Sequence, residues 1–316
     1  MERHPKVQVV SAIQVVLRNA VTAYYRLILR PSDDFDRNII YKMVWDRRPI
    51  LKVMSEKVSS LQYVRRIIPE ITFAHRYYET QDISAMDWES LPRNFVIKAS
   101  HGSGGVVIVH EGAPKDNYLP TQTKKFGWRR FEVHPDNFDK ELAIEIFSKL
   151  LKSTYGQGLN RGGPEWGYWG NKPHVIIEDF LSLGGEMPMH VTCNFVRGKL
   201  MLFFWDQIFY PNLSGSRVLY SRINTPPLDI EAIASELRVP RGEVEKIVEQ
   251  SSKIAGDIDY LRVDWLLSND GFFFNELTNY CGGGLLKGRI YYEVMSKMWC
   301  PDRSDYLISL ESGKSQ

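Results

Sequence analysis

The apolar residues in the first part of the chain have helical spacing. We expect one helix over residues 5–30, ending near Pro31. A second helix is expected over residues 55–68, where apolar positions recur at the spacing of one helix face. The polar segment 32–38 is typical of a helix start. This pattern predicts a helical N-terminal region over residues 1–90.

From residue 95 onward, short runs of β-branched and aromatic residues replace the helical spacing. Turn signals at Arg197-Gly198 and at residues 268–271 join neighbouring runs into hairpins. Strands are expected at 95–99, 106–109, 174–180, 191–195, 199–205, 261–267 and 272–277, and helices at 138–155, 230–250 (in two pieces, broken near Pro240) and 290–299. Hairpins without regular βαβ alternation predict an α+β fold.

The bulk composition is that of a globular chain with a sizeable core. Of the 316 residues, 43% are hydrophobic, which favours two or three closely packed subdomains over a string of modules. Forty basic residues face 38 acidic ones, so the net charge is near zero. Because no arginine-rich tract or binding motif appears, we expect no nucleic-acid partner.

The three cysteines favour a reducing compartment. Cys193, Cys281 and Cys300 form neither a disulfide framework nor a pair with metal-ligand spacing. We therefore expect free thiols and a cytoplasmic protein. Cys281 lies beside glycines, but no His or Asn partner signature marks it as a nucleophile, so a structural role is favoured.

The N-terminal segment Val7–Leu29 is apolar but repeatedly interrupted by polar residues. Gln14, Arg18 and Arg26 make it too polar for a transmembrane span, and it lacks the compact core of a signal peptide. We expect an amphipathic helix that packs on the body of the protein. Peripheral contact with a membrane is the alternative that the pattern leaves open.

A glycine-rich loop, Gly102-Ser103-Gly104-Gly105, lies between two expected strands. Its exposed amide N–H groups could wrap an anion, and a plain hairpin turn is the alternative. A Walker or Rossmann loop would lead into a helix, whereas this one leads into a run of four β-branched residues. Lys98 lies just before it in an apolar strand, so it either binds a phosphate or faces solvent on an edge strand.

Two carboxylates are expected to face each other on the hairpin formed by residues 261–278. Side chains alternate along a strand, so Arg262 and Asp264 share one face, and a three-residue loop at 269–271 would place Asp264 opposite Glu276. Facing carboxylates repel unless a cation lies between them, and such oxygen ligands suit Mg²⁺. An ordinary surface hairpin, with Arg262 neutralising one acid, is the alternative.

Taken together, these segments resemble the ATP-grasp superfamily, and within it the TupA-like (teichuronopeptide biosynthesis) branch. Each segment is short, but their order and spacing are specific, and the similarity covers residues 34–290. The segments that carry it are 91–98, 101–105, 165–166, 172–181, 262–264 and 275–278. The resemblance implies an ATP-grasp fold, in which two α+β subdomains grip ATP between antiparallel sheets. The lid subdomain would cover residues 91–180, and the metal-binding subdomain residues 181–316.

The resemblance also implies roles for individual residues. Lys98 and Arg262 would be catalytic, with Lys98 on the ATP phosphates and Arg262 on the acyl-phosphate or tetrahedral intermediate. Mg²⁺ would be held by Asp264, Glu276 and Thr278. The other residues implied to bind ATP are His101, Gly102, Ser103, Gly104, Gly105, Glu178, Asp179, Phe180 and Leu181, and those implied to close the acceptor side are Gly282, Gly283 and Gly284.

The chain departs from the family pattern at two places. Thr278 stands where many relatives place an asparagine ligand, although Asn279 follows immediately. No family-typical lysine or polar motif is obvious near residues 189–191. His190 could substitute there, but a hydrogen-bonded strand histidine is the favoured interpretation.

The expected activity is that of an ATP-dependent carboxylate–amine ligase. Closure of the glycine loop would keep water from the intermediate. The family context points to small or glycan-linked carboxylate and amine substrates in cell-surface polysaccharide or peptide synthesis. The alternatives are a kinase of a hydroxyl group, a glycosyltransferase (suggested by Asp257-Ile258-Asp259) and a non-catalytic carbohydrate-binding protein. The sequence leaves the substrates and the oligomeric state open.

Overall fold

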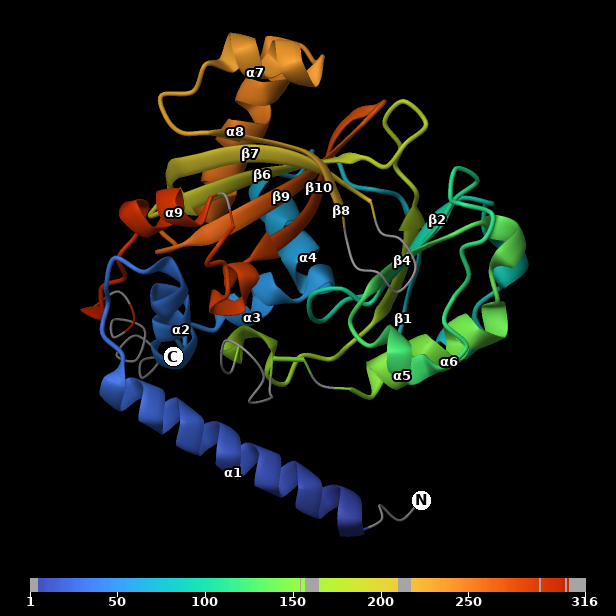
Figure 1. Ribbon diagram of the computed structural model, residues 1–316, viewed down its shortest axis with the longest axis horizontal. Helices are drawn as coiled ribbons and strands as arrows, with labels where there is room; N and C mark the ends of the chain where they lie inside the picture. The colour runs from blue at the N-terminus through green and yellow to red at the C-terminus, as the bar shows by residue number, and fades with distance from the viewer. Residues whose placement is uncertain are drawn as a thin grey trace.

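Two five-stranded β-sheets form the body of the protein (Figure 1). The computed structural model describes residues 5–153, 155–156, 165–209, 217–289, 291–304 and 306. Helices pack on both sheets, and α1 (Pro5–Ile28) extends along one side of the molecule. The structure therefore confirms the expected α+β class.

The first sheet has the strand order β1-β5-β2-β3-β4. Its strands are β1 (Arg76–Thr80), β5 (Val175–Asp179), β2 (Phe95–Ala99), β3 (Val106–Val109) and β4 (Arg130–Val133). All neighbours are antiparallel except β3 and β4, which run parallel, so this sheet is mixed. The connection from β3 to β4 includes the short helix α5 (Thr123–Phe126), which gives the chain room to return in the same direction.

Helix α6 (Lys140–Leu151) contributes to the core of the first sheet. It begins at Asp139, whose side chain accepts a hydrogen bond from the backbone N–H of Leu142 and so caps the first turn. The apolar face carries Ala143, Ile146, Phe147 and Leu150, all of which are buried. These side chains cluster with residues of β2, β3, β4 and β5, which joins helix and sheet in one core.

The second sheet is antiparallel throughout and has the order β10-β9-β6-β7-β8. Its strands are β10 (Gly271–Thr278), β9 (Leu261–Ser268), β6 (Met189–Val196), β7 (Lys199–Phe209) and β8 (Arg217–Asn224). Its core also includes side chains from α4 (Lys57–Ile67), α7 (Ile230–Leu237) and α8 (Arg241–Ala255). The expected break between the last two helices at Pro240 is confirmed.

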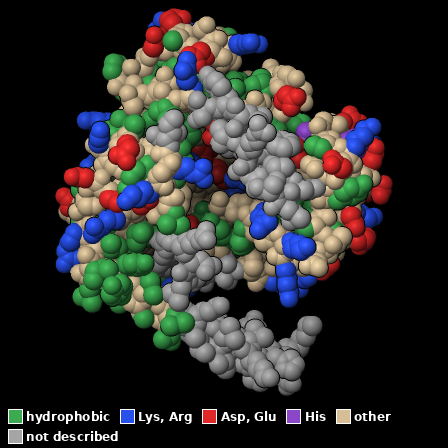
Figure 2. Space-filling view, viewed as in Figure 1, with side chains coloured by type: hydrophobic (Ala, Val, Ile, Leu, Met, Phe, Trp, Pro, Cys, Tyr) green, Lys and Arg blue, Asp and Glu red, His purple; other side chains and the backbone are tan. Residues whose placement is uncertain are grey.

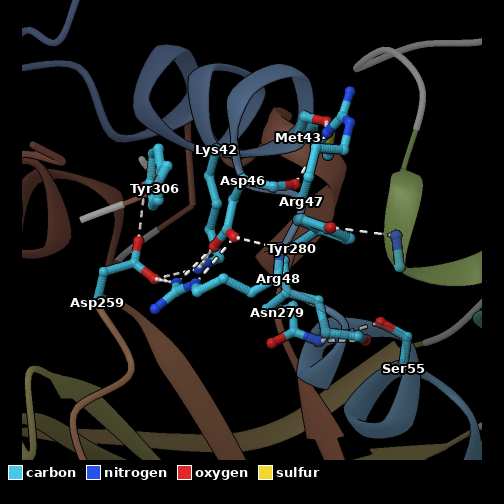
Figure 3. A network of polar contacts seen from close by, with 12 residues as sticks. Lys42, Met43, Asp46, Arg47, Arg48, Ser55, Asp259, Asn279, Tyr280 and Tyr306 are labelled. Atoms are coloured by element: carbon cyan, nitrogen blue, oxygen red, sulfur yellow. Dashed lines mark hydrogen bonds and ion pairs between the residues drawn. The ribbon is translucent and has the colours of Figure 1, made fainter. Parts of the chain in front are cut away.

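The N-terminal and C-terminal segments meet at a third core. It joins α2 (Phe35–Trp45) and Leu51 of α3 (Ile50–Ser55) to α9 (Tyr292–Met298) and to side chains of the second sheet. Beside it, buried Lys42 pairs with Asp46 and Asp259 (Figure 3).

The Lys42 network also explains the role of the candidate motif Asp257-Ile258-Asp259. Asp259 is 1% exposed, and its carboxylate is shared by Lys42, Arg48 and Tyr306 (Figure 3). A carboxylate engaged by three side chains is not available to hold a metal–sugar diphosphate. The Asp257-Ile258-Asp259 segment is therefore structural, which removes the one feature that suggested a glycosyltransferase.

The observed elements agree with most of the sequence-based expectations and add several. The structure confirms the expected hairpins β6–β7 and β9–β10. It adds β1, β4, β8 and the short helix α3, none of which was expected, and the expected helix over 55–68 is confirmed as α4. Of the expected helix 138–155, residues 140–151 are helical, while Ser153 lies outside it and residue 154 falls outside the described part. Likewise α9 begins at Tyr292, and residue 290 is not described.

Among the side chains described for helix α1, those that touch the body lie on one side of the helix. Arg18 lies over the ring of Trp169 at 3.8 Å, and the Nε of Arg26 donates to the carbonyl oxygen of Val44 at 2.7 Å. Thr22 and Leu29 are buried on the same side. The packing on the body is thus confirmed for this side of the helix. In the described ranges, no helix combines the length and the hydropathy of a bilayer-spanning segment.

Candidate active site between the two sheets

Two adjoining pockets are lined by residues from both sheets. Counted together with the solvent at their open sides, the space in the first is about 690 Å³ and in the second about 1250 Å³. Arg130, His190 and Glu276 line both, so the two pockets form one continuous cleft. In Figure 2, acidic and basic side chains are visible in a hollow near the centre of the molecule. A concave cleft that combines apolar walls with convergent charged groups is the first place to look for a ligand site.

Lys98 of β2 projects into the first pocket. It is only 6% exposed, and its ammonium group pairs with the carboxylate of Glu178 on the neighbouring strand β5. Burial lowers the pKa of Lys98, an effect that the charge of Glu178 opposes. The edge-strand alternative is therefore wrong: Lys98 lies on a central strand of the sheet, buried and paired, and its ammonium group lines the cleft.

The glycine-rich loop connects the antiparallel strands β2 and β3, as expected. Gly102 and Ser103 line the second pocket, and Gly104 lines the first. Gly104 has a φ of +80°, and a Cβ there would lie 1.7 Å from the carbonyl oxygen of Trp128. Only glycine fits this position, because any side chain would collide with the backbone of the adjacent segment.

Two implied nucleotide ligands from this loop do not line either pocket. The ring of His101 packs edge-on against Trp128 with the ring centroids 5.0 Å apart, and its Nε2 lies 3.3 Å from the carbonyl oxygen of Ser153. Gly105 also lies against the Trp128 ring, which a Cβ would approach to 3.1 Å. Both residues pack against Trp128, and neither lines the cleft.

The segment Glu178–Leu181 forms one wall of the first pocket, where the resemblance implies an adenine-binding strand. Apolar side chains of the first sheet continue this wall. They are Val96, Val106 and Ile108, with Met187 on the connection to the second sheet. Phe180 stacks on His110 with ring centroids 4.6 Å apart. This end of the cleft is thus an apolar slot bordered by two acids, Glu178 and Asp179.

Asp264 and Glu276 are directly paired across β9 and β10, as expected, but for a different reason. The turn contains two residues, because Ser268 already pairs with Gly271. A β-bulge between Phe274 and Glu276 then supplies the extra residue. The bulge restores the register that a three-residue loop would have given, so both carboxylates face the cleft.

A cluster of cations balances the two acids. Arg262 Nη2 lies 2.6 Å from Oδ2 of Asp264 and 3.7 Å from Oε1 of Glu276. Lys57 Nζ lies 3.4 Å from Oε2 of Glu276. Burial alone would raise the pKa of Glu276, but Lys57, Arg262, Arg130 and Lys98 together lower it to about 2. Glu276 is therefore ionised at neutral pH.

The donor set around Asp264 and Glu276 fits Mg²⁺. Thr278 lines the same pocket, and its hydroxyl lies 3.5 Å from Oδ2 of Asp264. Among the described residues, no group of three His, Cys, Asp or Glu side chains is arranged to hold a metal without further ligands. Mg²⁺ needs only one or two protein carboxylates when substrate phosphates and water complete its shell. Asn279 lines neither pocket; it is buried, and its amide nitrogen donates to Leu51 and Ser55.

The implied acceptor glycines divide into two groups. Gly282 and Gly283 line the second pocket, and both have positive φ angles. Gly284 does not line it; a Cβ there would meet Ile40 at 2.8 Å, so this glycine allows close packing against α2. The triplet thus supplies backbone to the cleft with its first two residues only.

Asp206 on β7 is a cleft residue that sequence reasoning missed. Asp206 pairs with His190 of β6, and Thr192, two residues further along β6, pairs with Asp264 of β9. Paired residues and residues two apart share one face of a sheet, so Asp206 faces the cleft with Asp264. Its Oδ1 is buried with no hydrogen-bond partner among the described residues. Burial and the negative charge of Asp264 raise the pKa of Asp206 to about 6. The sequence signal was an acid within the mostly apolar run of residues 200–209.

Glu165 is a second acid with an unusual environment in the second pocket. Burial raises its pKa to about 8, so its carboxyl group is mostly protonated at neutral pH. Its Oε1 lies beside Gly283, and aromatic side chains line the same pocket. These are Tyr155, Tyr168, Phe204, Tyr280 and Tyr291, of which Phe204 and Tyr291 are stacked with an interplanar angle of 13°.

His190 lines both pockets. Burial, followed by the positive charge of Arg130, lowers its pKa to about 4. The imidazole is therefore neutral at physiological pH and can donate or accept one hydrogen bond in the cleft. Sequence reasoning favoured a histidine without a role in the site, and the structure instead places it where the pockets meet.

No family model matches the chain, and no curated protein is similar to it. Among solved structures, D-alanine–D-alanine ligase from Bacillus anthracis is 15% identical with a TM-score of 0.43, over 83% of this chain and 69% of that chain. The ATP-grasp ligase PsnB complexed with minimal precursor is 11% identical with a TM-score of 0.42, over 84% and 64%. N5-carboxyaminoimidazole synthetase from Staphylococcus aureus is 12% identical with a TM-score of 0.38, over 79% and 53%. The chain spans less than two thirds of the length of the last two.

Proposed function

We propose that this chain is an ATP-grasp-type enzyme that joins a carboxylate to an amine through an acyl-phosphate. One observation carries the proposal: Lys98 of the first sheet and Glu276 of the second line the same pocket. Asp264 and Arg262 continue the lining into the adjoining pocket. A buried lysine, a glycine loop and two acids around one cleft are the parts that positioning of a triphosphate with Mg²⁺ requires.

In this proposal the nucleotide occupies the first pocket. The adenine would lie against the apolar slot beside Phe180 and Leu181, and Glu178 would accept hydrogen bonds from the ribose hydroxyls. The phosphates would extend toward Lys98 and Gly104. Lys98 would then exchange part of its contact with Glu178 for the phosphate oxygens, which offer more negative charge.

Asp264 and Glu276 are the residues that would hold Mg²⁺, and the ion would neutralise phosphate charge there. Glu276 suits this role because it is ionised and faces the cleft. Arg262 lies beside both acids and can stabilise charge that develops on the reacting groups. Lys57 holds the other oxygen of Glu276 and so fixes its orientation.

The second pocket would take the carboxylate and the amine. A carboxylate oxygen attacks the γ-phosphorus, the bond to the β–γ bridging oxygen breaks, and ADP leaves. The amine nitrogen then attacks the acyl carbon, and inorganic phosphate leaves with the acyl oxygen. The amine must lose a proton, and we assign its acceptance to Asp206, whose raised pKa of about 6 suits a base near neutral pH.

The similarity of short segments to the TupA-like branch supports a narrower proposal about the substrates. They would be precursors of a cell-surface polysaccharide or peptide, with a uronic-acid or glutamyl carboxylate and an amino acid or amine. The aromatic lining of the second pocket fits a sugar ring, since sugars stack on aromatic faces.

The experiment that tests the function is a panel of amino acids and uronic-acid acceptors with MgATP, followed by ADP release and product mass. Formation of an amide with free phosphate supports the ligase. A stable phosphoester would instead identify a kinase of a hydroxyl group. If calorimetry detected no binding of any nucleotide, the result would favour a non-catalytic carbohydrate-binding protein.

A further inference from the structure

Helix α1 presents an apolar face to solvent. The large exposed side chains on it are Val16 (66%), Leu17 (44%), Tyr24 (58%), Leu27 (74%) and Ile28 (48%). Ala20 and Ala23 are exposed between them. At about 100° per residue, these positions form one continuous stripe about 140° wide. The opposite side of the helix, with Arg18, Thr22 and Arg26, is the one that touches the body.

No other described element covers this stripe. Figure 1 shows α1 at the margin of the molecule, and Figure 2 shows hydrophobic side chains gathered around its C-terminal end. A helix that turns its apolar face away from the body reverses the usual arrangement of a surface helix. Exposed apolar surface of this extent marks a contact site for another molecule or a membrane.

Within residues 3–32 the charge has one sign; the exposed acids Asp33 and Asp302 lie outside this range. Residues 3–32 contain five basic residues and no acid, the basic ones being Arg3, Lys6, Arg18, Arg26 and Arg30. Arg30 is exposed at the end of the helix, where it donates to the carbonyl oxygens of Leu27 and Leu29. Burial lowers the pKa of Arg26, and the positive charge of Arg303 lowers it further, so Arg303 lies near Arg26. Arg303 is itself exposed and lies over the Trp45 ring at 4.0 Å.

We propose that α1 is an interfacial helix that docks the protein on an anionic lipid bilayer. Its apolar stripe would enter the boundary between head groups and acyl chains, and Arg30 and Arg303 would face the anionic head groups. A bilayer fits better than a second copy of the chain for two reasons. The stripe is wider than the narrow seam of a helix pair, and a second copy would bring positive charge against positive charge.

Docking of this kind would be independent of the chemistry in the cleft. None of the stripe residues lines either pocket, so the surface can be tested without reference to the proposed ligase activity. If the activity also holds, the helix would keep the enzyme close to lipid-linked substrates.

The test is sedimentation of the full chain with vesicles of phosphatidylcholine alone or mixed with phosphatidylglycerol. The protein should bind the anionic vesicles and be released by added salt, which screens the head-group charge. Leu27→Gln should weaken binding at least about tenfold, because a buried leucine side chain is worth that much or more. Arg30→Glu should weaken binding to the anionic vesicles only.

The matched control is Leu285→Gln, which changes another exposed leucine, outside α1, and should leave vesicle binding unchanged. Equal binding by Leu27→Gln and the unaltered protein would overturn the proposal, as would absence of binding to either vesicle. Concentration-dependent self-association in the absence of lipid, lost in Leu27→Gln, would also overturn it and identify a second copy as the occupant.

Discussion

At the scale of single residues, the paired acids Asp264 and Glu276 are the groups on which the proposed metal site depends. Asp264→Asn and Glu276→Gln each remove one negative charge with little change in shape. We expect each to reduce MgATP-dependent turnover by at least about 100-fold, since removal of charge stabilisation from a reacting centre costs about 3 kcal/mol. The measurement is ADP release at saturating ATP.

The control for both variants is Asp270→Asn on the exposed turn of the same hairpin. It makes the same chemical change to an acid that does not line the cleft, and it should retain full activity. Circular dichroism melting would show whether each protein is folded. A folded Glu276→Gln protein with undiminished turnover would exclude Glu276 from the metal site.

Asp206 gives a prediction about the pH dependence of turnover. A base must be deprotonated to act, and its pKa is raised to about 6, so the rate should rise with pH through about 6 and level off above it. Asp206→Asn should lose this limb and most of kcat, while Asp206→Glu should recover part of it. Because Asp206 lines the second pocket only, Asp206→Asn should leave the Kd for ATP unchanged. A larger Kd for ATP would instead assign Asp206 to nucleotide binding.

Glu165 gives a prediction about stability. Burial raises its pKa in the folded protein to about 8, from the usual 4.5, so the folded state binds the extra proton between these values. Stability therefore falls as pH rises from about 4.5 to about 8. Glu165→Gln, which cannot ionise, should escape this loss, and the difference in Tm between the two proteins should widen with pH. Parallel Tm curves would contradict the burial of this carboxyl group.

At the scale of secondary-structure elements, the β2–β3 loop depends on one glycine. Gly104→Ala would bring a Cβ within 1.7 Å of the carbonyl oxygen of Trp128 and would also strain a φ of +80°. The strain alone costs about 1–2 kcal/mol, and the collision adds to it. We expect a loss of well over 2 kcal/mol in the free energy of unfolding, measured with urea.

Gly184→Ala is the matched control for the loop, since Gly184 has a φ of +62° and open space where a Cβ would lie. It should show the strain without the collision. If both variants lost the same stability, the close approach of Trp128 to the loop would not matter, and the loop would be free to take other conformations in solution.

The β9–β10 hairpin shows how much of an element could be predicted. The alternation of Leu261, Val263, Trp265 and Leu267 predicted the buried face, and all four are buried. The pairing of the two acids was also predicted, but the bulge that produces it was not. A bulge depends on how the strand bends against its neighbours, and the local pattern carries no clear sign of it.

At the scale of the whole molecule, the network around Lys42 joins segments that are far apart in the chain. Lys42 is fully buried and pairs with Asp46 and Asp259, which also accepts hydrogen bonds from Arg48 and Tyr306. Asp259→Asn would leave the buried lysine undercompensated, at a cost of about 3–5 kcal/mol. Thermal unfolding should show this as a large loss in Tm.

Asp257→Asn is the control, because Asp257 is exposed two residues away and should change stability by no more than about 0.5 kcal/mol. A similar small effect at Asp259 would mean that the network does not hold the N-terminal helices on the second sheet.

The sequence alone determined the features that depend on local pattern. The alternation of side chains assigned Arg262 and Asp264 to one face of a strand, and the β-branched run after the glycines placed the loop between strands. Only the tertiary structure decided which groups meet. It paired Lys98 with Glu178, brought Asp206 and Glu165 into the cleft, and turned His101 away from it. The physical reason is that partner choice and burial, and therefore pKa, depend on long-range packing, which local residue spacing does not encode.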